Sequence, residues 1–209
     1  INDFNAGTDI HTKTASDVYG IPLDDVTKAQ RRDAKVINFG VLYGMSPHGL
    51  AAATGMSFHE AKLFIDEYFR LRAPIRRYID ATISRAKTDG YVETYFGRRR
   101  PTPDVRSSNF VVRQSAERQA ANMPIQGTEA DLMKMAMLKV EAELMPTGGA
   151  TKPLGVQVLQ IHDSILIECP RANAQVVGEL LKRSMEQVYP DLGIKLDVDI
   201  HICDNWGDA

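Results

Sequence analysis

The chain has 209 residues, of which 44% are hydrophobic and 25% charged, a balance typical of a globular protein with one good-sized core or two small units. No apolar run approaches the roughly 20 residues of a membrane span, and the first residues do not resemble a signal peptide, so a membrane partner is not expected. The two cysteines, Cys169 and Cys203, predict a reduced, cytoplasmic protein without a disulfide framework.

The first half of the chain predicts helices. They cover residues 11–18, a segment that begins near Pro22 and Asp24 and continues to about Met45, residues 57–70 and residues 73–88. Ser57 followed by Glu60 predicts a capping box at the start of the third of these helices. After residue 90 the segments 90–96 and 98–103 predict a short hairpin around Gly97.

In the second half of the chain, the pattern of apolar residues changes from a helical period to the alternation of strands. Helices are expected over residues 111–122 and 128–144, with Pro124 as an interruption between them, and a loop over residues 145–155. Apolar and polar residues then alternate over 155–161 and 164–169, which predicts a hairpin with His162 and Asp163 at its turn. A helix over 171–188 and a final strand over 196–202 complete an α+β fold, a helix-rich part followed by an antiparallel sheet.

One helical stripe combines cations with aromatic rings. Arg31, Lys35, Phe39 and Tyr43 are spaced four apart, and Gly44 follows directly. Because a four-residue step drifts only about 40° around a helix, the four side chains lie on one face. Two cations can bind a polyphosphate, and rings farther along can stack on a sugar and a base, which favours a nucleoside-triphosphate site. A solvated cationic face with core aromatics remains the alternative for the stripe alone.

Five blocks of the sequence resemble family A DNA polymerases, in the family's order. They read DIHTKTA at 9–15, RRDAKVINFGVLYG at 31–44, GYVETYFGRRR at 90–100, ERQAANMPIQGTEADLMK at 117–134 and LQIHDSILIE at 159–168. The resemblance implies a helix-rich fingers subdomain followed by part of an antiparallel-sheet palm. Residues 1–30 would then enter the fingers from the palm, residues 31–90 would form the fingers, and residues 91–209 the C-terminal part of the palm.

The resemblance also implies roles for individual residues. The expected triphosphate ligands are His11, Arg31 and Lys35, with Phe39 against the incoming sugar and Tyr43 beside the templating base. The expected DNA contacts are Arg100, Arg118, Asn122, Gln126 and His162. Asp163 is the expected catalytic carboxylate and ligand of Mg²⁺, since that ion prefers hard oxygen donors. The implied activity is primer extension with deoxynucleoside triphosphates on primer–template DNA, in DNA replication and repair.

Two departures from the family weaken that expectation. Ser164 stands where the family usually has a glutamate after the catalytic aspartate, so the site loses a negative charge. The family's other essential aspartate lies in a block like DYSQIE, expected about twenty residues before Ile1 and without an equivalent in this chain. The chain is therefore expected to be a fragment without the upstream palm strand, thumb and exonuclease domain, and inactive by itself.

Three functions remain in competition. The first is the fingers and palm part of a DNA polymerase, with its own N-terminal part as an expected partner. The second is a catalytically incomplete module that only binds nucleotide and DNA. The third is an RNA polymerase of related fold, against which Phe39 argues weakly and the polar helix face at 118–126 more strongly.

Overall fold

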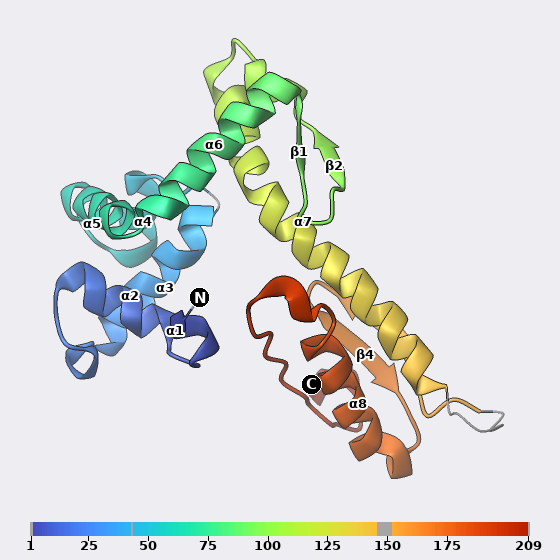
Figure 1. Cartoon of the computed structure of the whole chain (residues 1–209). Coiled ribbons are helices and arrows are strands. Elements are labelled where there is room, and N and C mark those ends of the chain that lie inside the picture. Colours follow the sequence, from blue (N-terminus) through green and yellow to red (C-terminus); the bar gives the residue numbers. More distant parts are fainter. Residues whose placement is uncertain (1, 43, 146–151, 209) are drawn as a thin grey trace. The chain divides into compact units, whose positions relative to one another are not determined.

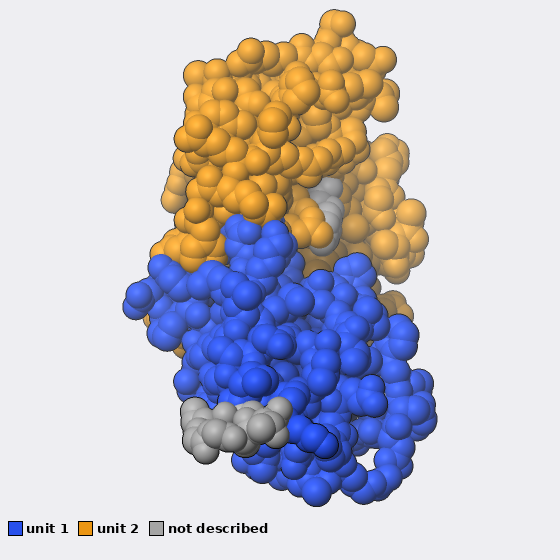
Figure 2. Space-filling model, turned by 90° about the vertical axis from the view of Figure 1, so that its right-hand side faces the viewer, with its two compact units in different colours: residues 1, 127–209 blue, residues 2–126 orange. Residues whose placement is uncertain are grey.

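The computed structural model describes residues 2–42, 44–145 and 152–208, and the chain divides into two compact units. The first unit along the chain contains residues 2–126 and is the orange unit 2 of Figure 2, and the second contains residue 1 with residues 127–209 and is the blue unit 1 of that figure. The helix α7 (Phe110–Leu144) begins in the first unit and ends in the second. The helix-rich α+β architecture expected from the sequence is confirmed (Figure 1).

The first unit is built from helices and one small hairpin. Its helices are α1 (Asn2–Asn5), α2 (Ile10–Tyr19), α3 (Lys28–Leu42), α4 (Pro47–Thr54), α5 (Phe58–Leu71) and α6 (Ala73–Asp89), followed by the first part of α7. Short 3₁₀ turns lie at Leu23–Asp25 and Pro103–Arg106. The expected hairpin is present as β1 (Tyr91–Glu93) and β2 (Arg99–Pro101), which pair antiparallel with Val92 opposite Arg100.

Side-chain caps and glycines set the ends of these helices. Ser57 accepts from the backbone of Glu60 while Glu60 Oε2 accepts from the backbone of Ser57, so the expected capping box is confirmed. Asp9 caps α2 by accepting from the backbone N–H groups of His11 and Thr12. The helix α6 ends at Gly90, whose φ of +82° lies in the left-handed region that favours glycine.

Two buried clusters hold the first unit together. One joins α3, α4 and α5 and is built from Ile37, Leu50, Ala61, Phe64 and Tyr68. The other joins α6, β1 and α7 and is built from Ala86, Val92, Val105, Ala120 and Met123. Because α3 turns its buried side chains toward the first cluster, its opposite face is exposed.

The expected break at Pro124 is wrong, because α7 continues through it (Figure 1). Proline removes one backbone hydrogen bond and costs about 3 kcal/mol in a helix interior. Buried residues on both sides of Pro124 offset that cost, since Ala120 and Met123 pack before it and Met133 and Ala136 pack after it. Tertiary packing therefore outweighs the local preference.

The second unit is a hairpin packed with helices. The expected strands are confirmed as β3 (Val156–Ile161) and β4 (Ser164–Glu168), which pair antiparallel with an irregularity between Gln157 and Leu159. The helix α8 (Ala174–Glu186) follows a 3₁₀ turn at Arg171–Asn173, and further short turns lie at Pro190–Leu192 and Trp206–Asp208. Its core is formed by Met133, Ala136, Val140, Leu144, Ile165, Val177, Leu180 and Met185.

The expected final strand over 196–202 is wrong. Burial does alternate there as the sequence predicts, with Leu196, Val198 and Ile200 less exposed than Asp197 and Asp199. No strand of the described part of the chain pairs with this segment, so it has the alternation of a strand without its ladder. It is held by side chains instead.

Those side-chain contacts lead to α8. The backbone N–H of Val198 donates to Glu186 Oε1 over 3.3 Å. The side chains of Ile200 and Ile202 reach Gly178, where a Cβ would lie 3.2 Å from Ile200 Cγ2. The segment is therefore attached to the surface of the helix.

Candidate functional site

The stripe expected on the fingers helix lies on the exposed face of α3. Arg31, Lys35 and Phe39 are exposed, and Ala34 and Ile37 on the opposite face are buried. Phe39 keeps 53% of its surface, which is large for an apolar ring on a well-packed helix. The stripe is therefore available to a ligand.

Arg31 is already paired within the protein. Its Nε donates to Asp9 Oδ2 over 2.6 Å, so the residue that caps α2 also binds the first cation of the stripe. The hydrogen bond from Arg31 holds the pKa of Asp9 well below its ordinary value, although partial burial opposes this shift. An anionic ligand at Arg31 would compete with the Asp9 carboxylate.

His11 lies against the same stripe. Its ring centroid is 5.8 Å from that of Phe39, and Asn38 Nδ2 lies 3.1 Å from His11 Nδ1. Partial burial lowers the pKa of His11, Asp9 raises it, and Arg31 and Lys35 lower it again. Arg31 and Lys35 act on His11 because α3 packs against α2, whereas Asp9 is its neighbour along the chain.

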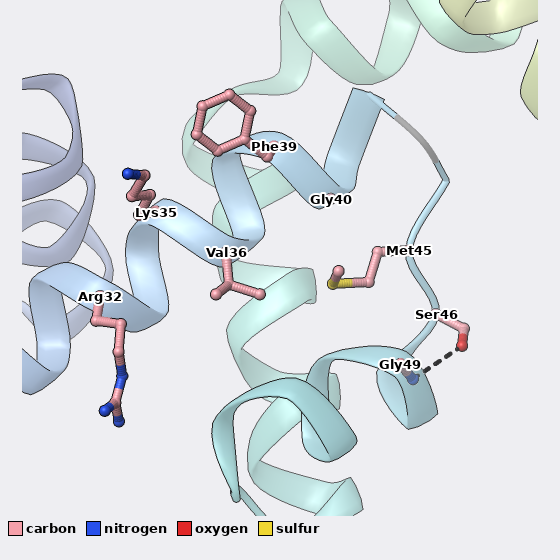
Figure 3. Close-up of a pocket in the computed structure, with 8 residues that line it drawn as sticks. All are labelled: Arg32, Lys35, Val36, Phe39, Gly40, Met45, Ser46 and Gly49. Carbon is pink, nitrogen blue, oxygen red and sulfur yellow. Dashed lines mark hydrogen bonds between the residues drawn. The ribbon is translucent and has the colours of Figure 1, made fainter. Parts of the chain in front are cut away.

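A cavity of about 520 Å³ opens beside the stripe, between α3 and α4 (Figure 3). Lys35 and Phe39 line it together with Arg32, Val36, Gly40, Met45, Ser46 and Gly49. Gly40 allows the close approach of Met45, because a Cβ at Gly40 would lie 2.6 Å from Met45 Sδ. The cavity thus combines an apolar wall with two cations, a lining suited to an aromatic, anionic molecule.

Tyr43, the last member of the expected stripe, lies outside the described residues. Gly44 follows with a φ of +66°, and a Cβ there would lie 2.5 Å from Arg118 Cγ. The end of the α3 segment therefore passes directly over α7. This close approach brings the first stripe next to the second one expected from the sequence.

The second stripe follows α7. Asn122 Nδ2 donates to Gln126 Oε1 over 2.7 Å, so these two amides lie side by side on the helix surface. Arg100 Nη2 donates to Gln119 Oε1 over 2.8 Å, which places the β2 arginine against the same helix. Arg100, Arg118, Asn122 and Gln126 therefore gather on one region of the first unit.

The turn between β3 and β4 carries His162 and Asp163. Ile161 pairs with Ser164, so these two residues alone make the connection. His162 has a φ of +50°, which is strained for a residue other than glycine. Both side chains are exposed, and Asp163 has neither a hydrogen-bond donor nor an ion-pair partner among the described residues.

The structure thus places the expected site residues in two sets. The set in the first unit contains His11, Arg31, Lys35, Phe39, Arg100, Arg118, Asn122 and Gln126, and the set in the second unit contains His162 and Asp163.

The sequence interpretation missed several neighbours of these residues. They are Asp9, Asn38, Gln119 and Glu129. Only Asp9 had a usable signal, since an aspartate before a helix is a cap.

In the described part of the chain, no group of three or more histidine, cysteine, aspartate or glutamate side chains could hold a metal ion. No helix there is long and apolar enough to cross a membrane. Asp163 does have the donor chemistry that Mg²⁺ prefers, a hard carboxylate oxygen in open solvent.

Comparison with models of known protein families identifies the family of this chain. The model described as DNA polymerase family A matches residues 1–208. The chain belongs to DNA polymerase family A. Members of this family are metal-dependent in general.

Individual relatives agree. The chain is 45% identical over 206 residues to the thermostable DNA polymerase I of Thermus aquaticus, covering 99% of this chain and 24% of that protein. It is 44% identical over 210 residues to DNA polymerase I of Streptococcus pneumoniae serotype 4, covering all of this chain and 23% of the relative. The chain therefore spans about a quarter of the length of these relatives.

A solved structure shows the same fold. The polymerase domain of Pol1 from M. smegmatis, in complex with DNA primer-template and dNTP, superposes with a TM-score of 0.83 at 37% identity. The match covers 94% of this chain and 34% of the other.

Proposed function

We propose that this chain forms the fingers and the C-terminal part of the palm of a DNA-templated DNA polymerase. The polymerase would add deoxynucleotides to a primer 3′-hydroxyl and release pyrophosphate. The observation that carries the proposal is the exposed α2–α3 face, on which His11, Arg31, Lys35 and Phe39 lie together in a chain of family A. The relatives from Thermus aquaticus and Streptococcus pneumoniae are both named DNA polymerase I, and the solved structure holds DNA primer-template and dNTP, which favours this function over RNA synthesis.

In this proposal the stripe on α3 binds the incoming nucleotide in order. Arg31 and Lys35 contact the triphosphate, because guanidinium and ammonium groups make charge-assisted hydrogen bonds to phosphate oxygens. Phe39 lies against the sugar, and Tyr43 lies beside the templating base. His11, whose pKa is lowered mainly by burial, would contribute a neutral imidazole to the phosphate side at neutral pH.

The polar face of α7 would bind the DNA. Arg118, Asn122 and Gln126 present donors to minor-groove acceptors that every base pair carries, so such contacts test shape without reading sequence. Arg100, which is held against α7 by Gln119, would extend this surface to a base edge or a phosphate. His162 would lie near the primer end.

Asp163 would hold Mg²⁺, which supplies charge stabilisation for phosphoryl transfer when bound. The carboxylate has no internal partner among the described residues and points from an exposed turn, so binding a cation breaks no existing contact. The subdomain boundaries expected from the sequence, 31–90 for the fingers and 91–209 for the palm, are part of the same proposal.

The test measures nucleotide and DNA binding by this 209-residue chain. Calorimetry with a deoxynucleoside triphosphate should show that Lys35→Ala weakens binding by about tenfold or more, since a charged phosphate contact contributes roughly 1.5–3 kcal/mol. Lys62→Ala on α5 is the matched control, because it removes an exposed lysine far along the chain from the stripe. Equal affinity in the wild type and Lys35→Ala would end the assignment.

Two further measurements on the same protein distinguish a polymerase part from a module that only binds nucleotide and DNA. Fluorescence anisotropy with a labelled primer–template measures DNA binding, and gel electrophoresis measures extension with Mg²⁺ and all four nucleotides. Binding without extension is expected of this chain alone, and it fits both a polymerase part and a binding module. Extension by a polymerase that contains residues 1–208 then decides between the two.

A further inference from the structure

His11 and Asn38 face each other where α3 packs against α2. Asn38 Nδ2 lies 3.1 Å from His11 Nδ1, and the same amide nitrogen lies 3.1 Å from Thr14 Oγ1. His11 and Thr14 are one turn apart on α2, so a single amide from α3 bridges both side chains. The ring nitrogen of His11 that carries the proton is therefore set by whether Asn38 donates or accepts in this bridge.

The single hydroxyl proton of Thr14 is used within its own helix. Thr14 Oγ1 donates to the carbonyl of Ile10 over 2.8 Å, whereas Asn38 Oδ1 lies farther away, at 3.2 Å. A hydroxyl has one proton to donate and two lone pairs that accept. The Thr14 hydroxyl therefore contacts its other neighbours as an acceptor.

Arg72, between α5 and α6, occupies one of these two lone pairs. Its Nη2 lies 3.0 Å from Thr14 Oγ1 and must donate, because a guanidinium has no acceptor. The same nitrogen lies 3.3 Å from Asp17 Oδ2, and the guanidinium carbon lies 4.8 Å from the centroid of the Tyr68 ring. Asp17 and Tyr68 thus hold Arg72 against the Thr14 hydroxyl.

These contacts fix the orientation of the Asn38 amide. The Thr14 hydroxyl has one lone pair left, and Asn38 Nδ2 donates to it. A second proton remains on Nδ2, and His11 Nδ1 at 3.1 Å is a nearer acceptor than the carbonyl of Ile10 at 3.5 Å. With the amide turned over, its oxygen would face a lone pair of Thr14 with no proton between them. His11 Nδ1 therefore accepts and carries no proton.

The neutral ring of His11 then carries its proton on Nε2, the outer nitrogen of the imidazole. The ring centroid lies 5.8 Å from that of the exposed Phe39, so the ring lies at the edge of the exposed α2–α3 face. An ionised triphosphate offers only acceptors, and Nε2–H is a donor that suits it. The other tautomer would present a lone pair to the phosphate.

The charges around His11 favour the neutral ring as well. Burial lowers the pKa of His11, Asp9 at the start of α2 raises it, and Arg31 and Lys35 of α3 lower it. An imidazolium carries N–H groups on both ring nitrogens, so one of them would face the NH₂ group of Asn38. The amide therefore opposes protonation and selects one of the two neutral forms.

We propose that Asn38 is a positioning residue that holds His11 in the Nε2–H form, so that the histidine donates to a phosphate of the incoming nucleotide. Thr14 and Arg72 support this role by fixing the orientation of the Asn38 amide. The inference rests on the proposed function, because it takes the triphosphate as the ligand of His11. The tautomer itself is set by the protein and exists before the nucleotide binds.

The first measurement is the tautomer of His11 in the 209-residue chain without ligand. Two-bond proton–nitrogen correlation spectra distinguish a protonated ring nitrogen from an unprotonated one by its nitrogen shift. The chain has five histidines, and His11→Gln identifies the signals of His11. Above the pKa of His11, we expect the Nε2–H form to exceed the Nδ1–H form by about tenfold or more. A predominant Nδ1–H form would overturn the proposal.

Asn38→Asp replaces the donor with an acceptor of the same shape and should reverse the tautomer. A carboxylate accepts from Nδ1–H, so the neutral ring loses the proton on Nε2 and the pKa of His11 rises. Gln30→Glu is the matched control, because it makes the same change from amide to carboxylate on α3, where the side chain accepts from the backbone of Thr27. The control should keep the Nε2–H form. If Asn38→Asp keeps it too, Asn38 does not set the tautomer.

Two variants at Thr14 test the orientation of the amide without any change at Asn38. Thr14→Val removes the hydroxyl that fixes the amide, so both tautomers of His11 should be populated. Thr14→Ser keeps the hydroxyl and should keep the wild-type tautomer. Circular dichroism checks that each variant is folded. Equal spectra of His11 in the two variants would overturn the part assigned to Thr14.

Calorimetry with a deoxynucleoside triphosphate separates this inference from the proposed function. Above the pKa of His11, Asn38→Asp should weaken binding about tenfold more than Gln30→Glu does, because Nε2 then presents a lone pair to phosphate. Relative to the control, part of this loss should return as the pH falls below the raised pKa of His11, since the imidazolium again carries Nε2–H. If the tautomer reverses without this extra loss, His11 does not contact the triphosphate, and the proposed ligand assignment fails although Asn38 sets the tautomer.

Discussion

The α2–α3 face and the β3–β4 turn differ in whether their charged side chains are paired within the protein. On the α2–α3 face, Arg31 is paired with Asp9, and Asn38 contacts His11. At the β3–β4 turn, Asp163 has no partner among the described residues, and its neighbour His162 has strained backbone. On the α2–α3 face Arg31 is thus held in an ion pair before any ligand arrives, whereas the carboxylate at the β3–β4 turn is not.

This difference teaches how each region is suited to its proposed ligand. A triphosphate is large and makes several contacts, so it can displace Asp9 from Arg31 and still bind with net gain. A single divalent ion makes few contacts to protein and loses water reluctantly, so it needs carboxylates that no internal cation holds. Mutations that change the charge of each region therefore test the comparison.

The largest effect is expected at the turn. In a chimera that carries residues 1–208 in place of the matching part of the Thermus aquaticus polymerase, Asp163→Ala should lower kcat about a thousandfold, since a metal ion contributes several kcal/mol to phosphoryl transfer. Single-turnover extension measures it, with Glu179→Gln as the control. A loss below about tenfold would show that Asp163 is not a metal ligand.

Phe39→Tyr should have the next largest effect, in the same chimera. The phenyl ring cannot hydrogen-bond where the 3′ side of the sugar is expected, so the wild type should discriminate against dideoxynucleotides. A tyrosine hydroxyl could restore the polar contact, worth roughly 1.5–3 kcal/mol, or about ten- to a hundredfold in relative incorporation.

The measurement for Phe39→Tyr is kcat/KM for a dideoxy- and a deoxynucleotide on one template. The value for the normal nucleotide should stay nearly unchanged, because its own 3′-hydroxyl already supplies the contact. If the ratio of kcat/KM for the dideoxynucleotide to that for the deoxynucleotide changes by less than about threefold, Phe39 does not contact the sugar.

Asp9→Asn should strengthen triphosphate binding by this chain, by up to about fivefold. It releases Arg31 from an exposed ion pair of the kind worth about 0.2–1 kcal/mol, and asparagine still caps α2. Asp66→Asn on α5 is the control, because it makes the same charge change at another exposed ion pair. Weaker binding by Asp9→Asn than by the control would mean that Asp9 positions Arg31 for the ligand instead of competing for it.

The smallest effect concerns stability in acid. The pKa of Asp9 is lowered in the folded state, so its ion pair stabilises the fold above the ordinary value of 3.8 and this stabilisation is lost as the pH falls below it. Arg31→Gln should raise the pKa of Asp9 and make the unfolding midpoint in urea fall less between pH 7 and pH 3. Because the pair is exposed, the change in midpoint should be small.

Local signals in the sequence predicted most of the elements. Ser57 and Glu60 fixed the start of α5, and alternation fixed β3 and β4, because these features depend on residues close in the chain. Pro124 and the segment 196–202 were misjudged, since packing on both sides carries α7 through the proline and no strand pairs with 196–202 among the described residues.

In the candidate site, too, local features could be predicted from the sequence and contacts between distant segments could not. Spacing alone placed Arg31, Lys35 and Phe39 on one face of a helix, because that requires only helix geometry, and the structure shows that this face is exposed. The pairing of Arg31 with Asp9 could not be predicted, since it joins elements that are far apart in sequence.

The two-residue turn at His162 and Asp163 also limits which insertions the gene can tolerate. One extra codon between Ile161 and Ser164, if absorbed by the strand, would slip β4 by one position and exchange its two faces. Ile165, which is 8% exposed, would leave the core, and a neighbour from the outer face would take its place. Single-residue insertions that shift β4 should therefore be excluded at this turn.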